Sequence, residues 1–156
     1  MSRRNAAQKR YPQKDGEYNS YLVTLLIQRV LKNGKKRLAE NIVKETFYLI
    51  KNKTEKSSLL VFEQAVNNVR PVVQLKSRRV GGSTYQIPVD VSLYRSITLA
   101  LKWIILAAKT RPGKSFSTKL AQEIIEASNS SGNAFRKREE THRMAKANKA
   151  FTYLRF

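Results

Sequence analysis

Few residues in this chain could perform catalysis, and their spacing does not favour it. The sequence has no cysteine and one histidine, His142, so it cannot supply a Cys-based zinc site or a multi-histidine metal centre. Glu139 and His142 are three residues apart, like half of a carboxylate-bridged di-metal site, but that site needs a second histidine. The acids mostly stand near Lys or Arg, which is typical of structural charge pairs. We therefore expect neither an enzyme nor a cofactor.

Residues 108–115 match a permissive phosphate-loop pattern, in which backbone amides surround phosphates and a lysine reaches the terminal ones. Such a loop follows a β-strand, whereas residues 97–108 repeat apolar side chains at helical spacing. No apolar strand ending in a magnesium-binding aspartate follows. A basic turn is the better interpretation of this segment.

The composition instead favours electrostatic binding. Thirty-one Lys and Arg against eleven Asp and Glu give a formal net charge of +20, which predicts a polyanionic partner such as a nucleic acid. An anionic membrane would also attract this charge, but the longest apolar runs, 22–27 and 103–108, are far shorter than the roughly 18 residues of a membrane span. At 156 residues the chain fits one soluble domain, 1–156, with no membrane and no small-molecule partner.

Helical elements must position these charges. Apolar spacing predicts helices over about residues 18–31, 36–52, 58–69, 93–108, 116–127 and 134–154, the last followed by a tail to 156. Ser57 or Ser58 is predicted to cap the third helix, and the fourth is expected at the centre of the bundle. Residues 1–16 are basic without apolar periodicity, which predicts a flexible arm. The aromatic side chains expected in the core are Phe47, Phe62, Trp103, Phe116 and Phe151.

Between the third and fourth helices the apolar period changes to two, which predicts a β-hairpin over residues 72–91. Gly81-Gly82 suits a two-residue turn, and this turn places Arg78 opposite Tyr85 and Lys76 opposite Ile87. Such a cationic tip is suited to an anionic partner. Tyr85 could stack on an unpaired base or pack along the hairpin, and the sequence leaves both open.

Four strings, residues 33–36, 76–89, 111–113 and 132–145, resemble the small-subunit ribosomal protein seven family of bacteria and plastids. The resemblance implies a mainly α fold, a bundle of six helices with a protruding two-stranded β-hairpin between the third and fourth. It also implies primary binding to the 3′ major domain of 16S-type rRNA, organisation of the subunit head, and neighbouring ribosomal proteins of head and platform. The first four residues and residues 148–151 look like cyanobacterial and plastid members, and with no transit peptide before them we expect a chloroplast ribosome.

The resemblance also assigns roles to individual residues. The residues expected to contact rRNA are Arg3, Arg4, Lys9, Arg10, Lys32, Lys35, Lys36, Arg37, Lys76, Arg95, Lys109, Arg111, Lys114, Lys119, Arg136, Arg138 and Arg143. The residues expected near exit-site tRNA and mRNA are Arg78, Arg79, Gly81, Gly82, Tyr85 and Lys149. Two other classes of protein stay as alternatives. The first is a DNA-binding architectural or regulatory protein, since the positive charge attracts any duplex. The second is an RNA-processing enzyme, for which the sequence lacks candidate catalytic residues.

Overall fold

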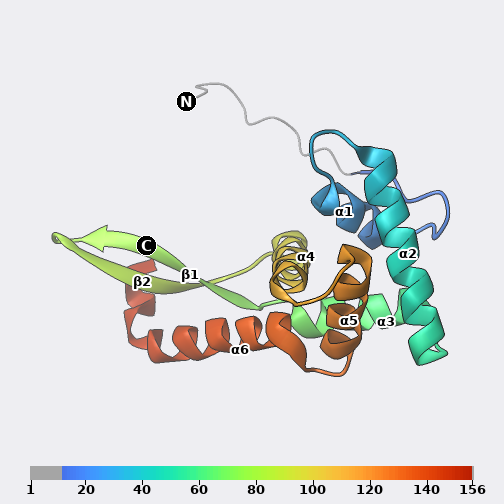
Figure 1. Cartoon of the computed structure of the whole chain (residues 1–156). Helices are drawn as coiled ribbons and strands as arrows, with labels where there is room; N and C mark the ends of the chain where they lie inside the picture. The colour runs from blue at the N-terminus through green and yellow to red at the C-terminus, as the bar shows by residue number, and fades with distance from the viewer. Residues whose placement is uncertain (1–11, 156) are drawn as a thin grey trace, which may run out of the picture.

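The computed structural model describes residues 12–155, which form a helical bundle with one protruding hairpin (Figure 1). The elements in this part of the chain are α1 Tyr21–Val30, α2 Lys36–Thr54, α3 Ser58–Val69, β1 Val73–Val80, β2 Ser83–Asp90, α4 Leu93–Thr110, α5 Phe116–Ser128, α6 Gly132–Ala147 and a 3₁₀ segment, η1, Lys149–Arg155. The predicted fold class, six helices with a hairpin between the third and fourth, is confirmed. No helix among the described residues has the length and apolarity needed to cross a bilayer.

The core lies where the apolar faces of the first five helices meet. Helix α5 packs against α2, α3, α4 and α6, so it shares the central position that the sequence predicted for α4. Its side chains Leu120 and Ile124 are fully buried, as are Leu101 and Ile104 of α4. These residues stand at the helical spacing read from the sequence, which is why the core was predictable.

The aromatic residues divide between the core and the hairpin. Phe47 and Phe62 are buried, with their ring centroids 5.5 Å apart, and the Tyr18 ring lies 4.9 Å from Phe47. Trp103 and Phe116 are partly buried and pack against the core. The expectation for the fifth aromatic, Phe151, was wrong, because it lies in η1 and packs against the hairpin rather than in the bundle.

A turn precedes the first helix. Residues 1–11, which include most of the predicted flexible arm, lie outside the described residues. Within the remainder, the Asp15 carboxylate accepts the backbone N–H groups of Glu17 and Tyr18, each at 3.1 Å, and so fixes a turn inside the predicted arm. Helix α1 starts three residues later than predicted, after Asn19 at φ +46°. Ser57 stands at the N-cap of α3, but its side chain makes no capping hydrogen bond.

The hairpin has the predicted register, with Arg78 opposite Tyr85 and Lys76 opposite Ile87. Gly81 and Gly82 have φ values of +57° and +89°, which is the pair of positive angles that a two-residue turn of this hand requires. Ile87 is the buried anchor on β2, whereas the strand positions from Lys76 to the turn are exposed. The hairpin therefore projects from the bundle on a short apolar base (Figure 1).

Three polar contacts from α4 and α6 hold the base of the hairpin. The Ser96 hydroxyl donates to the Pro71 carbonyl at 2.6 Å, and the Val72 N–H donates to Nε2 of His142 at 3.2 Å. Arg95 Nε of α4 donates to the Gln74 amide oxygen of β1 at 3.3 Å. Arg95, expected at the rRNA, thus also ties α4 to β1.

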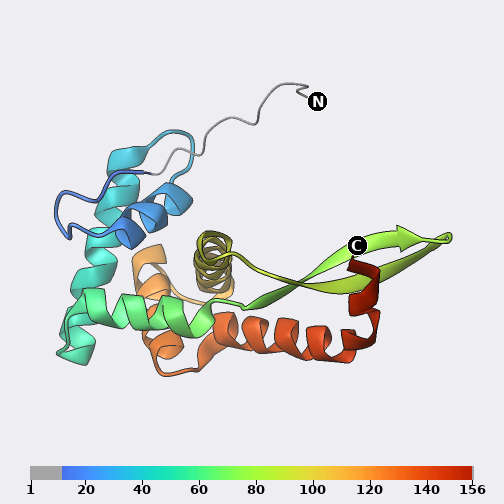
Figure 2. The ribbon, with the colours of Figure 1, turned by 180° about the vertical axis from the view of Figure 1, so that it is seen from behind.

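The C-terminal region departs from the predicted continuous helix over residues 134–154. Helix α6 begins at Gly132 and ends at Ala147, where the Asn148 side chain donates to the Met144 carbonyl at 2.9 Å. The chain then turns through η1 toward the hairpin, and both views show η1 against it (Figures 1 and 2). The centres of the Phe151 and Tyr85 rings lie 5.2 Å apart. This aromatic contact joins η1 to β2 in place of a continuation of α6.

Candidate nucleic-acid interface

Two basic segments that are far apart in sequence line one cavity of about 440 Å³. Lys32 and Lys35 come from the turn between α1 and α2, and Lys109 comes from the last turn of α4. The residues that line this cavity, which we call the basic-rimmed pocket, are Arg29, Val30, Lys32, Asn33, Lys35, Leu38, Ala39, Ile42, Ile105, Lys109 and Phe116. The fold thus unites two of the segments that the sequence predicted to contact rRNA.

The α1–α2 turn presents its lysines because its backbone reverses tightly. Asn33 and Gly34 have φ values of +52° and +72°, a left-handed pair that glycine adopts without strain. The Lys35 N–H donates to the Lys32 carbonyl at 3.1 Å, and the Lys36 N–H donates to the Gly34 carbonyl at 2.8 Å. The side chains of residues 32–37 are consequently exposed in one short stretch.

Little negative charge opposes this cluster. The basic-rimmed pocket has no acidic residue in its lining, and among residues 12–155 no ion pair involves Lys32, Lys35, Arg37 or Lys109. Lys36 lies 3.6 Å from Glu40, but its side chain is 75% exposed and such a pair contributes little. The cluster is therefore available to an anionic ligand.

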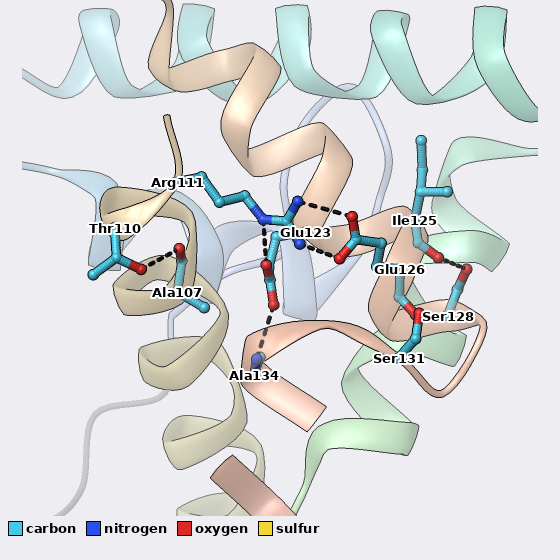
Figure 3. Close-up of polar contacts among 9 residues, drawn as sticks. All are labelled: Ala107, Thr110, Arg111, Glu123, Ile125, Glu126, Ser128, Ser131 and Ala134. Atoms are coloured by element: carbon cyan, nitrogen blue, oxygen red, sulfur yellow. Dashed lines mark hydrogen bonds and ion pairs between the residues drawn. The ribbon is translucent and has the colours of Figure 1, made fainter. Parts of the chain in front are cut away.

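Arg111 has a different role from its basic neighbours. Its Nε lies 2.5 Å from Oε2 of Glu123, and its two terminal nitrogens hold the carboxylate of Glu126 in a bidentate pair (Figure 3). Glu123 is fully buried, and its other oxygen accepts the N–H of Ala134 at 2.8 Å. We call Arg111, Glu123, Glu126 and the Ala134 amide the hinge cluster, because it joins the end of α4 to α5 and to the start of α6.

The hydrogen bonds between Arg111 and Glu126 favour the charged forms of these two residues. The hydrogen bond to Glu126 is the main cause that raises the pKa of Arg111, and the hydrogen bond from Arg111 is the main cause that lowers the pKa of Glu126. Arg111 was predicted to contact rRNA, and this contact stays a prediction; the structure gives its guanidinium two carboxylates inside the protein. Of the other residues in this segment, Lys114 is exposed and Lys119 half-buried.

Helix α6 carries a second basic face. Arg136 and Arg143 are exposed and line a shallow surface hollow of about 570 Å³ together with Lys137, Glu139 and Glu140. The Lys137 amine lies 2.7 Å from Glu140. Arg138 is instead half-buried. Its Nη1 donates to the carbonyl of Asn68 on α3 at 2.6 Å, and its guanidinium lies 4.3 Å from the centre of the Phe135 ring. Arg138 therefore fastens α6 to α3.

The hairpin tip displays the residues expected near tRNA and mRNA. Lys76, Arg78 and Arg79 are exposed along β1, and Gly81-Gly82 form the turn. The Tyr85 ring packs against Phe151 of η1 at an interplanar angle of 50°, and its stacking on an unpaired base stays a prediction. Lys149 is exposed at the start of η1, on the segment that packs against β2.

His142 has a structural partner. Its Nε2 accepts the Val72 N–H, so the neutral imidazole holds the entry to the hairpin. Burial, and then the charges of Arg138 and Lys146, lower the pKa of His142 and keep it neutral at physiological pH. Within residues 12–155 no group of three or more His, Asp or Glu side chains is arranged to hold a metal ion.

The sequence did not reveal the partners of Arg111 and Arg138, since they lie 12 and 70 residues away. One usable signal existed: Glu123 interrupts an apolar face of α5 that contains Leu120 and Ile124, and a buried acid in such a place needs a cation. Arg29 was also missed as part of the pocket rim, although it stands one helical turn before Lys32.

Comparisons with known proteins agree with this architecture. The family model for ribosomal protein S7p/S5e matches residues 2–149. Small ribosomal subunit protein uS7c of Trieres chinensis is 56% identical over 144 residues, covering 92% of this chain and 91% of the relative. Small ribosomal subunit protein uS7 of Thermosynechococcus vestitus is 51% identical, and that of Trichormus variabilis 49% identical, each over 156 residues and the full length of both chains. The chain therefore belongs to the ribosomal protein S7p/S5e family.

Proposed function

We propose that this protein, a structural and non-enzymatic constituent of the small ribosomal subunit, binds the 3′ major domain of 16S-type rRNA and organises assembly of the subunit head. The observation that carries the proposal is the basic-rimmed pocket, where Lys32, Lys35 and Lys109 stand together without a neutralising acid. Lysines in this arrangement replace the counterions of phosphate groups, which supplies affinity for folded RNA. The exposed Arg136 and Arg143 extend the positive surface charge along α6.

The hairpin supports a second part of the proposal, contact with exit-site tRNA and mRNA. It projects from the bundle (Figure 2), and its exposed side chains include Lys76, Arg78 and Arg79. The hairpin is thus suited to reach beyond the rRNA surface that the bundle covers. Helix α6 lies beside it and is proposed to face a neighbouring protein of the platform, while other proteins of the head contact the bundle.

We also propose a plastid ribosome as the site of action. The support is the 56% identity to the uS7c of Trieres chinensis, beside 49–51% to cyanobacterial uS7 proteins. Sedimentation of a cell extract tests this: the protein should travel with small subunits from isolated plastids. Its recovery with bacterial subunits alone would contradict a plastid origin.

The binding proposal is tested with a transcribed 3′ major domain fragment of 16S-type rRNA. If about eight phosphates are contacted, log affinity should fall with log salt at a slope near −6 to −7. Duplex DNA of equal length, at equal salt, should bind more weakly, because the proposal requires recognition of RNA shape. A slope shallower than about −2, or equal affinity for the duplex, would contradict the proposal.

The hairpin is tested by replacing Arg78 and Arg79 with alanine. Affinity for the rRNA fragment should stay within about twofold, while small subunits containing the variant should retain exit-site tRNA poorly. Lys51 and Lys53, exposed at the end of α2 and outside the basic-rimmed pocket, provide a control that removes the same charge. Equal defects in subunit assembly and tRNA retention would show that the hairpin belongs to the rRNA anchor instead.

A further inference from the structure

We propose that the basic-rimmed pocket holds one unpaired nucleotide of the bound rRNA, with its base on the apolar floor and its flanking phosphates at the cationic rim. This inference rests on the proposed rRNA binding and deepens it. It assigns a defined ligand to a cavity that phosphate contacts alone do not explain.

The apolar half of the pocket is the first argument. Leu38 of α2 is 55% exposed at the pocket, although it belongs to a strongly basic turn and helix start. Ala39 and Ile105 are buried next to it, and Phe116 contributes an aromatic ring. Phosphate groups gain no binding free energy from contact with an apolar surface. The face of a nucleobase does, because the face is planar and weakly hydrated.

The volume and the lining of the pocket fit a small ligand. Its volume of about 440 Å³ lies in the range of about 300–1,000 Å³ that is usual for ligand pockets. Asn33 is the one uncharged polar side chain in the lining, and an amide offers both a donor and an acceptor to the edge of a base. The pocket therefore provides for both the face and the edge of a base.

The rim charges come from two separate elements of the fold. Arg29, Lys32 and Lys35 belong to the end of α1 and the turn after it, and Lys109 belongs to the end of α4. A nucleotide that leaves a helix has one phosphate on each side of its sugar, so cations from two separate elements can each take one. The pocket lining contains no acid that would repel these phosphates.

Other occupants fit less well. A base-paired RNA helix keeps its bases stacked and has no face to insert. The N-terminal residues of this chain include Arg3, Arg4, Lys9 and Arg10, which have the same sign of charge as the rim. A segment of a neighbouring protein would need an apolar side chain surrounded by acids, and this alternative is an outcome of the experiment below.

The first experiment compares Leu38→Ala with Leu60→Ala. Both leucines are well exposed, at 55% and 64%, but Leu60 lies on α3 outside the pocket. With the transcribed 3′ major domain fragment as probe, Leu38→Ala should weaken binding about 5- to 10-fold and leave the salt slope unchanged, because no charge is lost. Leu60→Ala should stay within about twofold. Lys35→Ala should weaken binding and make the slope shallower by about one.

The second experiment identifies the nucleotide. A benzophenone amino acid at position 38 should crosslink, on irradiation of the complex, to a nucleotide that is unpaired in the fragment. Removing that base, to leave an abasic site, should weaken wild-type binding at least as much as Leu38→Ala, because the base also meets Phe116 and Asn33. The loss caused by the abasic site should be smaller in the Leu38→Ala variant than in the wild type, because part of the contact of the base is with this leucine.

Three results would overturn the inference: equal affinities of the Leu38→Ala and Leu60→Ala variants, additive effects of Leu38→Ala and the abasic site, or a crosslink within assembled subunits only to protein. Each is distinguishable from failure of the proposed function. If rRNA binding retains its steep salt slope and its preference over duplex DNA, only the pocket assignment fails. If both are absent from the wild-type protein, the rRNA proposal itself fails.

Discussion

Replacing Arg111 with methionine tests whether this residue belongs to the hinge cluster or to the RNA surface. Methionine keeps most of the side-chain volume but removes the charge that faces Glu123, whose carboxylate is fully buried. The Arg111 side chain is itself only 15% exposed, so solvent cannot replace it. Removing one partner of a buried ion pair costs about 3–5 kcal/mol, because the other charge is left without compensation. We expect a loss of this size in the free energy of unfolding.

Thermal and urea unfolding, followed by circular dichroism, measure the effect. For a domain of this length each kcal/mol corresponds to about 3 °C, so the melting temperature should fall by about 9–15 °C. The double variant Arg111→Met/Glu123→Gln should recover part of the loss, since it leaves no buried charge. Glu126→Gln should cost about 1 kcal/mol or less, because Glu126 is 43% exposed and Arg111 keeps Glu123.

The opposite result is easily recognised. If Arg111→Met changes the unfolding free energy by less than about 0.5 kcal/mol and instead weakens rRNA binding, Arg111 is an RNA ligand and the reasoning about the hinge cluster is wrong. Lys109 lies two residues earlier and is exposed. Lys109→Ala should therefore weaken rRNA binding and leave the free energy of unfolding unchanged.

Two further predictions concern the joints around α6. Gly132→Ala should lower the free energy of unfolding, measured by urea titration, by about 1–2 kcal/mol. The cause is that φ is +87° and that the new Cβ would lie 3.1 Å from an oxygen of Glu123. Gly16→Ala is the control and should leave the free energy of unfolding unchanged, because Gly16 has open space around it. The lowered pKa of His142 means that its contribution to stability is present above about pH 6.5 and is lost as the pH falls. Hydrogen exchange at the Val72 amide, corrected for the intrinsic rate, should therefore become faster between pH 7 and pH 5 in the wild type. In His142→Gln it should not, because the glutamine carbonyl accepts a hydrogen bond at every pH. Equal exchange profiles of the two proteins would contradict the role of His142 as acceptor for the Val72 N–H.

Local patterns predicted the bundle and hairpin because they depend on spacing alone. The apolar faces of α4 and α5 repeat every three to four residues, and the alternation around Gly81-Gly82 set the register to the residue. What these features share is that each is determined within one turn or one hairpin.

Contacts between distant segments were not predictable in the same way. Arg111 and Lys109 are two residues apart and equally basic, yet Arg111 is held by the buried carboxylate of Glu123 while Lys109 lines an open pocket. Only the packing of α5 against α4 decides between these outcomes. The fold of η1 against the hairpin had a similar cause, since Phe151 continues the helical spacing of α6 and its actual partner, Tyr85, lies on another element.

High salt should weaken the interactions of the exposed cations in this protein much more than those of the buried Arg111. Exposed charges such as Lys35 interact with phosphates through solvent, where the screening length falls to about 3 Å at 1 M salt, so rRNA binding should be lost there. Arg111 and Glu123 are in contact inside the protein and are screened much less. The melting temperature in 1 M KCl should therefore equal or exceed its value at 0.1 M while the complex dissociates, because salt also screens the repulsion within a net charge of +20. A lower melting temperature in 1 M KCl would show instead that exposed ion pairs such as Lys44–Glu17, and not the buried cluster, hold the helices together.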